Sequence, residues 1–542
     1  MFALRPFAAI SWCIEFYSIK DISVRPWPDF IVHSLMQIIW FKRDLRLQDS
    51  RPLFESLKRS NIERFGSVLP IYIHEPSQIE HPDVSRQHQM FVQETLGELA
   101  EDFEAIGGRL VELCGEAIEV FKRIHAQHTI AKVWSHRETT NQAGFTRDVA
   151  VRGFLSGQDI PFDEMPQNGI ARGAEVRQSF PDYFAESVRN HTVRDPRGVD
   201  LTARFATPPF HSVDPVEIPL AGGADKAYRA RGGRKAAEAI MQVFFQANTI
   251  LAYPKRLSSP NSAFDGCSRL SPYLAYGVIS DVEIFQAVDR AVTDANGSMP
   301  KIAFHRFESA ARFYLDRLAW RRDYMQTFED QPDLEYKCML PEFNGLRPQT
   351  YDPELMTRFE EGRTGFPFVD ALMRCLRATG HIHMRGRATL ASFATMNLFL
   401  PVFSGDQDGV ARLLARQFID WEPAVHFPIL QLISGTTPFE RMMVYNPIKA
   451  GFDHDPKGDF VRQWLPELSD LEGGAALQPE LTSSHLSQEA FSGGYEPYPS
   501  PIVDAKASAK FAKDCIKRIQ SGKSAKEAVS KTGSLVDQPS LF

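Results

Sequence analysis

The stretch GCSRLSPYL, residues 266–274, is poorly explained by hydrophobic patterning. Its small and hydroxyl-bearing residues come directly before a run, residues 272–279, that we expect to be helical. Backbone N–H groups and hydroxyls at a helix N-terminus bind anions well, and a diphosphate is a suitable occupant. The same residues would also serve as an ordinary helix cap, so the pattern alone leaves both readings open.

Two other segments change that balance, namely WFKRDLRL at residues 40–47 and DHDPKGDFVRQWLP at residues 453–466. Together with residues 266–274 they resemble the photolyase/cryptochrome family. The resemblance extends over residues 36–502 and is closest to a divergent prokaryotic branch of DNA photolyases. It implies a blue-light flavoprotein that carries FAD.

Composition sets broad limits on the 542-residue chain. Its length favours two or more domains, and 43% hydrophobic and 24% charged residues are typical of a globular protein. A net charge of -7 argues against a coat for nucleic acid but allows a local basic groove. The chain lacks the apolar run of about 20 residues that spans a bilayer.

The cysteines are scattered and form no CxxC pair, so we predict no zinc or iron–sulfur site. This cysteine usage fits a reducing cytosol and a cytoplasmic protein. We also expect a monomer. The six cysteines are Cys13, Cys114, Cys267, Cys338, Cys375 and Cys515.

The first half of the chain alternates strand and helix patterns. Expected strands cover residues 37–41, 68–73, 109–113 and 131–135, with a helix over 89–103. This order predicts an N-terminal α/β domain with a doubly wound parallel sheet (Rossmann-like) over residues 36–165. Such sheets bind ligands beyond the carboxyl ends of their strands.

The rest of the chain has a different pattern. Residues 166–233, rich in Pro, Gly and charge, predict an inter-domain linker. Residues 234–504 are helical in pattern and predict an all-α C-terminal FAD-binding domain. We expect residues 1–35 to be a disordered leader and residues 505–542 a tail, partly one solvated helix.

The resemblance implies a set of cofactor-binding residues. Arg387 and Asp420 match a pair that orients the flavin, and a buried pair of this kind satisfies both charges. The full set is Tyr253, Cys267, Ser268, Arg269, Leu270, Ser271, Tyr314, Arg321, Arg387, Asp420, Trp421 and Glu422.

The implied catalytic residues are Arg317, Trp320, Met384 and His426. Arg317 stands where pyrimidine-dimer photolyases usually carry a glutamate, and an arginine would stabilise an anion by a different geometry. It would alternatively be a solvent-facing helix charge. His426 falls beside flavin N5, where its charge would change near neutral pH, unless it only packs.

Arg322 and Arg385 are expected to contact backbone phosphates of UV-damaged DNA. The implied activity is light-dependent repair of pyrimidine dimers. The alternatives are a cryptochrome-like photoreceptor without repair and a binding module without working flavin. We expect no metal at His381 and His383, because alternate positions on a helix point apart.

Two family features are missing or altered. Leu430 and Val402 stand at the positions of the family's flavin-proximal and middle electron-transfer tryptophans. Residues 135–140 follow a strand end, where the resemblance places an antenna chromophore such as a pterin or deazaflavin. Gly144 stands in the place of the family's folate-holding glutamate, so the identity of any antenna stays open.

Overall fold

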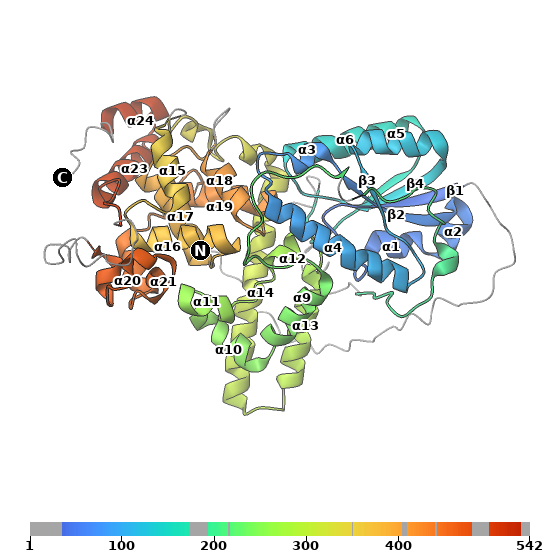
Figure 1. Cartoon of the computed structure of the whole chain (residues 1–542), viewed down its shortest axis with the longest axis horizontal. Helices are drawn as coiled ribbons and strands as arrows, with labels where there is room; N and C mark the ends of the chain where they lie inside the picture. Colours follow the sequence, from blue (N-terminus) through green and yellow to red (C-terminus); the bar gives the residue numbers. More distant parts are fainter. Residues whose placement is uncertain are drawn as a thin grey trace.

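The computed structural model describes residues 35–172, 193–214, 217–348, 351–403, 409–438, 442–479 and 498–532. Figure 1 shows two lobes, a sheet flanked by helices and a larger lobe made of helices. Both expected classes of domain are therefore present. The predicted leader lies outside the described residues, apart from Leu35 at the start of the first strand.

The sheet of the α/β domain has five strands in the order β3-β2-β1-β4-β5, and every neighbouring pair is parallel. Sequence reasoning found four of these strands. The fifth, with the sequence FDEM, has no apolar run and no fully buried residue, so its pattern gave no signal. The strands are β1 Leu35–Phe41, β2 Ser67–His74, β3 Val111–Cys114, β4 Thr129–His136 and β5 Phe162–Met165.

The central strand β1 is buried on both faces, which makes the domain doubly wound. Ile38 and Trp40 pack with the cluster that includes α5 and α6. Ile39 and Phe41 point to the opposite side and pack with α1 and α4. The helices of this domain are α1 Arg51–Ser56, α2 Arg59–Phe65, α3 Pro76–Ile79, α4 Arg86–Ala105, α5 Ala117–Gln127 and α6 Gln142–Gly157.

The carboxyl end of β1 leads directly to the helical domain. The Leu45 N–H donates to the Tyr276 carbonyl at 3.2 Å, and Arg43 donates to the Trp421 carbonyl at 3.0 Å. The two domains therefore meet at the edge of the sheet where parallel strands place ligands.

The helical domain begins at Arg234 and is built around the long helix α14 and the apolar helix α19. These two helices lie against each other in the interior of the domain. Its helices to residue 477 are α9 Arg234–Phe244, α10 Ala247–Arg256, α11 Pro260–Gly266, α12 Ser271–Ala275, α13 Asp281–Ala295, α14 Lys301–Asp330, α15 Pro353–Glu361, α16 Pro367–Thr379, α17 Met384–Ser392, α18 Val410–Gln417, α19 Pro423–Ser434, α20 Pro447–His454, α21 Asp459–Trp464 and α22 Gly474–Leu477.

Short irregular helices complete the described chain. They are the 3-10 helices η2 Thr202–Arg204, η4 Pro332–Glu335, η5 Pro341–Phe343 and η7 Pro466–Leu468, and the π-helix η6 Phe393–Asn397. The described part of the predicted linker contacts both domains: Phe205 pairs with Val68 of β2, and the Lys226 ammonium donates to the Leu376 carbonyl of α16. None of the described helices is long and apolar enough to cross a membrane.

The expectation of a solvated tail after residue 504 is wrong for residues 505–532. They form α23 Ala505–Gln520 and α24 Ala525–Thr532, which pack against the helical domain. Ile516 and Phe511 are buried there, and the Phe511 ring lies 5.1 Å from that of Phe399. The lysines that dominate the composition lie between these apolar positions and concealed an amphipathic helix.

This packing predicts a large stability difference between two isoleucines. Ile516→Ala should lower the free energy of unfolding by about 2–5 kcal/mol, because Ile516 is fully buried. Ile302→Ala is the matched control; Ile302 is 72% exposed, so its loss should change stability by about 0.5 kcal/mol or less. Urea unfolding of both variants measures the difference, and equal stabilities would mean that α23 is not part of the core.

Candidate functional site

Arg387 and Asp420 form an ion pair in the helical domain, in which Asp420 is buried and Arg387 is partly exposed. Arg387, in α17, donates from both terminal nitrogens to the two Asp420 oxygens, at 2.9 and 2.7 Å. Burial alone would raise the pKa of Asp420, but the charge and hydrogen bonds of Arg387 outweigh it and lower that pKa to about 2. Asp420 is therefore a carboxylate at neutral pH.

The GCSRLSPYL stretch forms the connection between α11 and α12. The expected helical run over residues 272–279 is shorter than predicted, since α12 ends at Ala275. Arg269 has a φ of 53°, a left-handed conformation that is uncommon for residues other than glycine. Leu270 is buried in the core, and burial raises the pKa of the Cys267 thiol to about 11, so this thiol stays protonated.

Two serines of this stretch lie beside the ion pair and α14. Ser271 helps to lower the pKa of Asp420, and Ser268 lies near the Tyr314 hydroxyl, which is buried and has no hydrogen-bond partner among the described residues. The Tyr314 ring lies 5.4 Å from that of Tyr253 at 90°. The structure thus gathers the phosphate-type loop, both tyrosines and the Arg387–Asp420 pair, as expected for one cofactor site.

Arg317 and Trp320 stack on the same helix, α14. The Arg317 guanidinium lies 3.9 Å from the Trp320 ring and 4.3 Å from that of Phe313. Burial of Arg317 lowers its pKa, and the positive charge of Arg385 lowers it further. Arg317 is thus only partly exposed, and its Nε has no hydrogen-bond partner among the described residues.

Two large apolar side chains lie on the surface of this region. Trp320 is 47% exposed and Met384, at the start of α17, is 50% exposed. Arg385 is exposed beside Met384. Exposed apolar groups that adjoin a cation make a suitable surface for an unstacked base and its phosphate.

His426 lies in α19 and hydrogen-bonds to the Ala411 carbonyl through Nε2 at 2.9 Å. Burial lowers its pKa to about 4. The expectation that its charge changes near neutral pH is therefore wrong, because the imidazole is neutral there. His381 and His383 also lie elsewhere than predicted, in the turn before α17 and not within a helix.

Arg321 and Arg322 belong to a buried ion cluster around Asp281. Arg321 donates to Glu422 at 2.7 and 3.0 Å and to Asp281 at 3.2 Å. Arg322 donates to Asp281 at 2.9 Å and is only 1% exposed. The prediction that Arg322 contacts DNA is wrong, because a side chain this deep cannot reach phosphates. The sequence around Arg322 did not indicate that its side chain is buried.

Trp421 packs against the α/β domain. Its ring stacks on His88 at 6.0 Å, and the Arg43 guanidinium lies 5.3 Å from it and 4.9 Å from the Tyr276 ring. The indole Nε1 is buried and has no partner within the described part of the chain. Sequence reasoning did not place Arg43, His88 and Tyr276 around Trp421, because they come from segments far apart in the chain.

Trp421 and these three residues line a cavity of about 140 Å³ between the domains. Glu138 and Thr140 also line it, so it lies where an antenna chromophore was expected. The volume is close to that of an engineered cavity that holds one benzene molecule. A pterin or deazaflavin has more than one ring, so it would need Trp421 or a neighbouring side chain to move.

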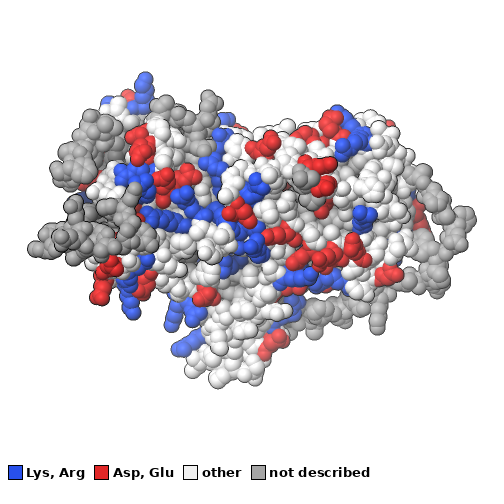
Figure 2. Space-filling model, in the orientation of Figure 1, with Lys and Arg blue, Asp and Glu red and all other residues white. Residues whose placement is uncertain are grey.

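The charged surface is uneven. Figure 2 shows lysines and arginines gathered over the helical domain near its junction with the α/β domain, with acidic side chains interspersed. A local basic region therefore exists on a chain of net charge -7.

Comparison with known proteins agrees with this geometry. Residues 37–193 match a family model described as DNA photolyase, and residues 314–518 match one described as the FAD binding domain of DNA photolyase. A deoxyribodipyrimidine photo-lyase of Streptomyces griseus is 29% identical, over 88% of this chain and 98% of its own. A cryptochrome DASH of Gloeobacter violaceus is 27% identical, over 87% of this chain and 94% of its own.

The chain belongs to the photolyase/cryptochrome family. Its fold is that of the cryptochrome structure from Synechocystis, with a TM-score of 0.72 at 22% identity over 89% of this chain and 99% of that one. Relatives carry both photolyase and cryptochrome names, so membership alone leaves repair and light sensing unresolved.

The helical part of this family member is its FAD-binding domain, and its residues fit that cofactor. The Arg387–Asp420 pair would contact the flavin, and the loop over residues 267–271 would hold the diphosphate. The Nε2 of His383, just before α17, is buried and has no hydrogen-bond partner within the described residues. This polar atom is therefore available to a bound cofactor. Leu430 and Val402 are buried in the apolar core, so neither position can pass electrons as tryptophan does.

The pKa of His426 predicts a pH effect on stability. His426 binds a proton near pH 6.5 in the unfolded chain but only near pH 4 in the folded chain. The free energy of unfolding therefore falls as the pH drops from 6.5 to 4. Between pH 7 and pH 5, the free energy of unfolding of the wild type should therefore fall by about 2 kcal/mol more than that of His426→Asn. Urea unfolding at both pH values measures this, with exposed His305→Asn as the control. Equal losses in all three proteins would mean that His426 is not buried as described.

Proposed function

We propose that this protein is a light-dependent DNA repair lyase of the deoxyribodipyrimidine photolyase type, which splits cyclobutane pyrimidine dimers. The observation that carries the proposal is the exposed surface of Trp320, Met384 and Arg385 beside the FAD-type site. A photoreceptor needs the flavin but has no need of an exposed aromatic and cationic surface next to it. We also propose that the protein acts as a monomer in the cytoplasm.

A flipped dimer would contact Trp320 and Met384 through its apolar faces. Bound, reduced FAD supplies an electron to the lesion under blue light, and the electron returns after the cyclobutane bonds split, so the reaction has no net redox change. Arg317 would stabilise the negative charge on the lesion, because it is already held in place by its stacking on Trp320 and Phe313. Arg385 would contact the backbone phosphate, which makes DNA binding sensitive to salt.

Arg317 replaces the family's glutamate with a different kind of group. A glutamate accepts hydrogen bonds from a lesion base, whereas a guanidinium can only donate them. The negative charge on the lesion would therefore face a fixed cation. The aliphatic residues at 402 and 430 remove the usual route by which flavin is reduced in light, so the repair state would depend on reduction by another route.

The test is repair of oligonucleotides that each contain one cyclobutane dimer or one (6-4) product, with chemically reduced protein under blue light. Chemical reduction bypasses the missing tryptophans. We expect restoration of the cyclobutane dimer in light and none in the dark. Trp320→Ala should slow repair at least tenfold, because the lesion loses its stacking partner. Tyr228→Ala, which also removes an exposed aromatic ring, is the matched control and should leave the rate unchanged.

Other outcomes would contradict the proposal in distinct ways. Restoration of only the (6-4) product would contradict the lesion assignment. No repair by protein that retains its FAD would favour a cryptochrome-like photoreceptor. A purified chain without FAD, and without repair, would indicate a binding module.

A further inference from the structure

Lys226, in the described part of the linker, contacts the ends of two helices of the helical domain. Its ammonium donates to the Leu376 carbonyl of α16 at 2.9 Å and to the Gln417 carbonyl of α18 at 2.7 Å. It also donates to the side-chain oxygen of Gln417 at 2.8 Å. The three N–H donors of the ammonium are therefore all used, and its charge lies beside the partial negative charge of both helix ends.

These two helix ends lead directly to the two partners of the ion pair in the flavin site. A short turn joins α16 to α17, which carries Arg387, and α18 ends shortly before Asp420. The two connecting segments are also joined by the Ile419 N–H, which donates to the Gly380 carbonyl at 2.9 Å. The lysine Lys226, this backbone hydrogen bond and the ion pair thus join the same two segments at three successive places.

The end of α18 is capped by the α/β domain as well as by the linker. The Ser85 hydroxyl and the Gln87 side-chain amide both donate to the Arg416 carbonyl, at 2.8 and 2.7 Å. The Gln87 amide also donates to the carbonyl of the next residue at 3.0 Å. These two side chains are neutral, so Lys226 supplies the positive charge that a helix C-terminus favours.

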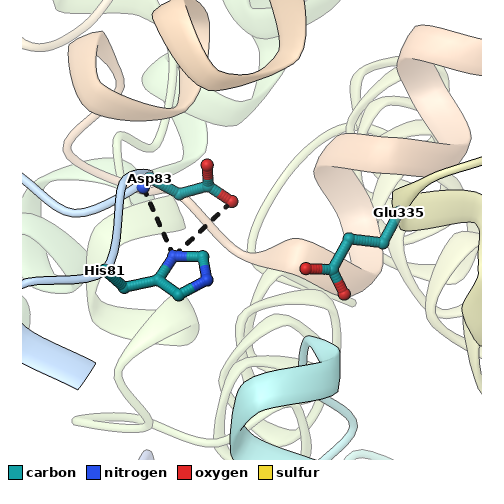
Figure 3. A group of neighbouring side chains, drawn as sticks. All are labelled: His81, Asp83 and Glu335. Carbon is teal, nitrogen blue, oxygen red and sulfur yellow. Dashed lines mark hydrogen bonds and ion pairs between the residues drawn. The ribbon is translucent and has the colours of Figure 1, made fainter. Parts of the chain in front are cut away.

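The linker is itself held on the α/β domain next to this lysine. Arg229 is only 5% exposed and donates to both carboxylate oxygens of Glu94 in α4, each at 2.9 Å. The chain just before α4 makes a further contact between the domains, where His81 and Asp83 face Glu335 of the helical domain (Figure 3). The α/β domain is therefore a fixed base from which the lysine holds both helix ends.

We propose that Lys226 is a positioning residue of the flavin site, whose ammonium sets the position of Arg387 relative to Asp420 by holding the ends of α16 and α18 together. Without the ammonium, both carbonyls lose a charged donor and the two segments lose one of their three joints, so FAD should bind more weakly. The proposal rests on the role of the ion pair in FAD binding and does not depend on the repair activity.

A lysine that only ties the linker to the helical domain is the competing account. In that case the loss of Lys226 would weaken FAD binding by the same factor whether or not the ion pair is intact. If Lys226 acts through the ion pair, its loss should have little further effect once Asp420→Asn has already disrupted the pair.

The ionisation of Lys226 provides a second readout. Burial and the positive charge of Arg377 lower the pKa of Lys226 to about 7, while Glu360 and Cys375 act in the opposite direction. Above this pH the neutral amine has two N–H donors for three acceptors. The wild type should therefore bind FAD about threefold more weakly at pH 8.5 than at pH 6, and this change should be absent from Lys226→Met.

The experiment measures the dissociation constant of oxidised FAD by titration of the full chain after its flavin has been removed. The variants are Lys226→Met, Asp420→Asn and the double variant. We expect Lys226→Met to bind FAD about tenfold more weakly than the wild type, and the double variant to lie within about threefold of Asp420→Asn. Lys235→Met is the matched control and should bind like the wild type, because Lys235 is exposed and its ammonium pairs with Glu101 of α4.

Circular dichroism confirms that each variant is folded. If Lys226→Met is not, Lys226→Gln replaces it, because its side chain is one atom shorter and has only two N–H donors. The proposal is overturned if Lys226→Met binds FAD as tightly as Lys235→Met, if its effect is the same with and without Asp420→Asn, or if its pH dependence equals that of the wild type. FAD binding is measured without light or DNA, so the result is independent of repair.

Discussion

The Arg387–Asp420 ion pair is the interaction on which the rest of the site depends. It joins α17 to the segment before α19. Arg387 also donates to the Ile382 carbonyl at 3.1 Å, and the Ile419 N–H donates to the Gly380 carbonyl at 2.9 Å. The turn before α17 and the segment around Asp420 are therefore fixed to each other. Loss of the Arg387 charge would leave Asp420 buried and unpaired, at a cost of about 3–5 kcal/mol.

The same segment, residues 418–422, also joins the two domains. His88 hydrogen-bonds to the Phe418 carbonyl at 2.8 Å, and Arg43 donates to the Trp421 carbonyl. Glu422 is held by Arg321 in the helical domain. A change in the domain contact would therefore also move Asp420. Trp421, which lines the cavity between the domains, is the next residue in the chain, so the cavity and the Arg387–Asp420 pair share one segment.

The sequence predicts most of the fold because burial on both faces leaves a readable pattern. The apolar runs of β1, β2 and β4 lie where expected, whereas β5 lacks such a run and was missed. Alternating lysines concealed the apolar face of α23. In both elements polar residues hid the pattern, because β5 has no apolar run and lysines separate the apolar positions of α23.

The same limit applies to the site. The family resemblance identified the Arg387–Asp420 pair, and the structure shows the two hydrogen bonds between them. The resemblance could not show that Arg322 points into the core toward Asp281, or that burial keeps His426 neutral. It also gave no sign of Arg43 and His88 around Trp421, because contacts between domains leave no local pattern.

The most direct test of the central claim is a double-mutant cycle on Arg387 and Asp420, with the dissociation constant of FAD as the measured quantity. Arg387→Gln and Asp420→Asn should each weaken FAD binding, and the double variant should be little worse than either one. The coupling should exceed about 1 kcal/mol, as found for residues in direct contact. Additive losses, or unchanged FAD binding in the single variants, would contradict the account that this pair organises the flavin site.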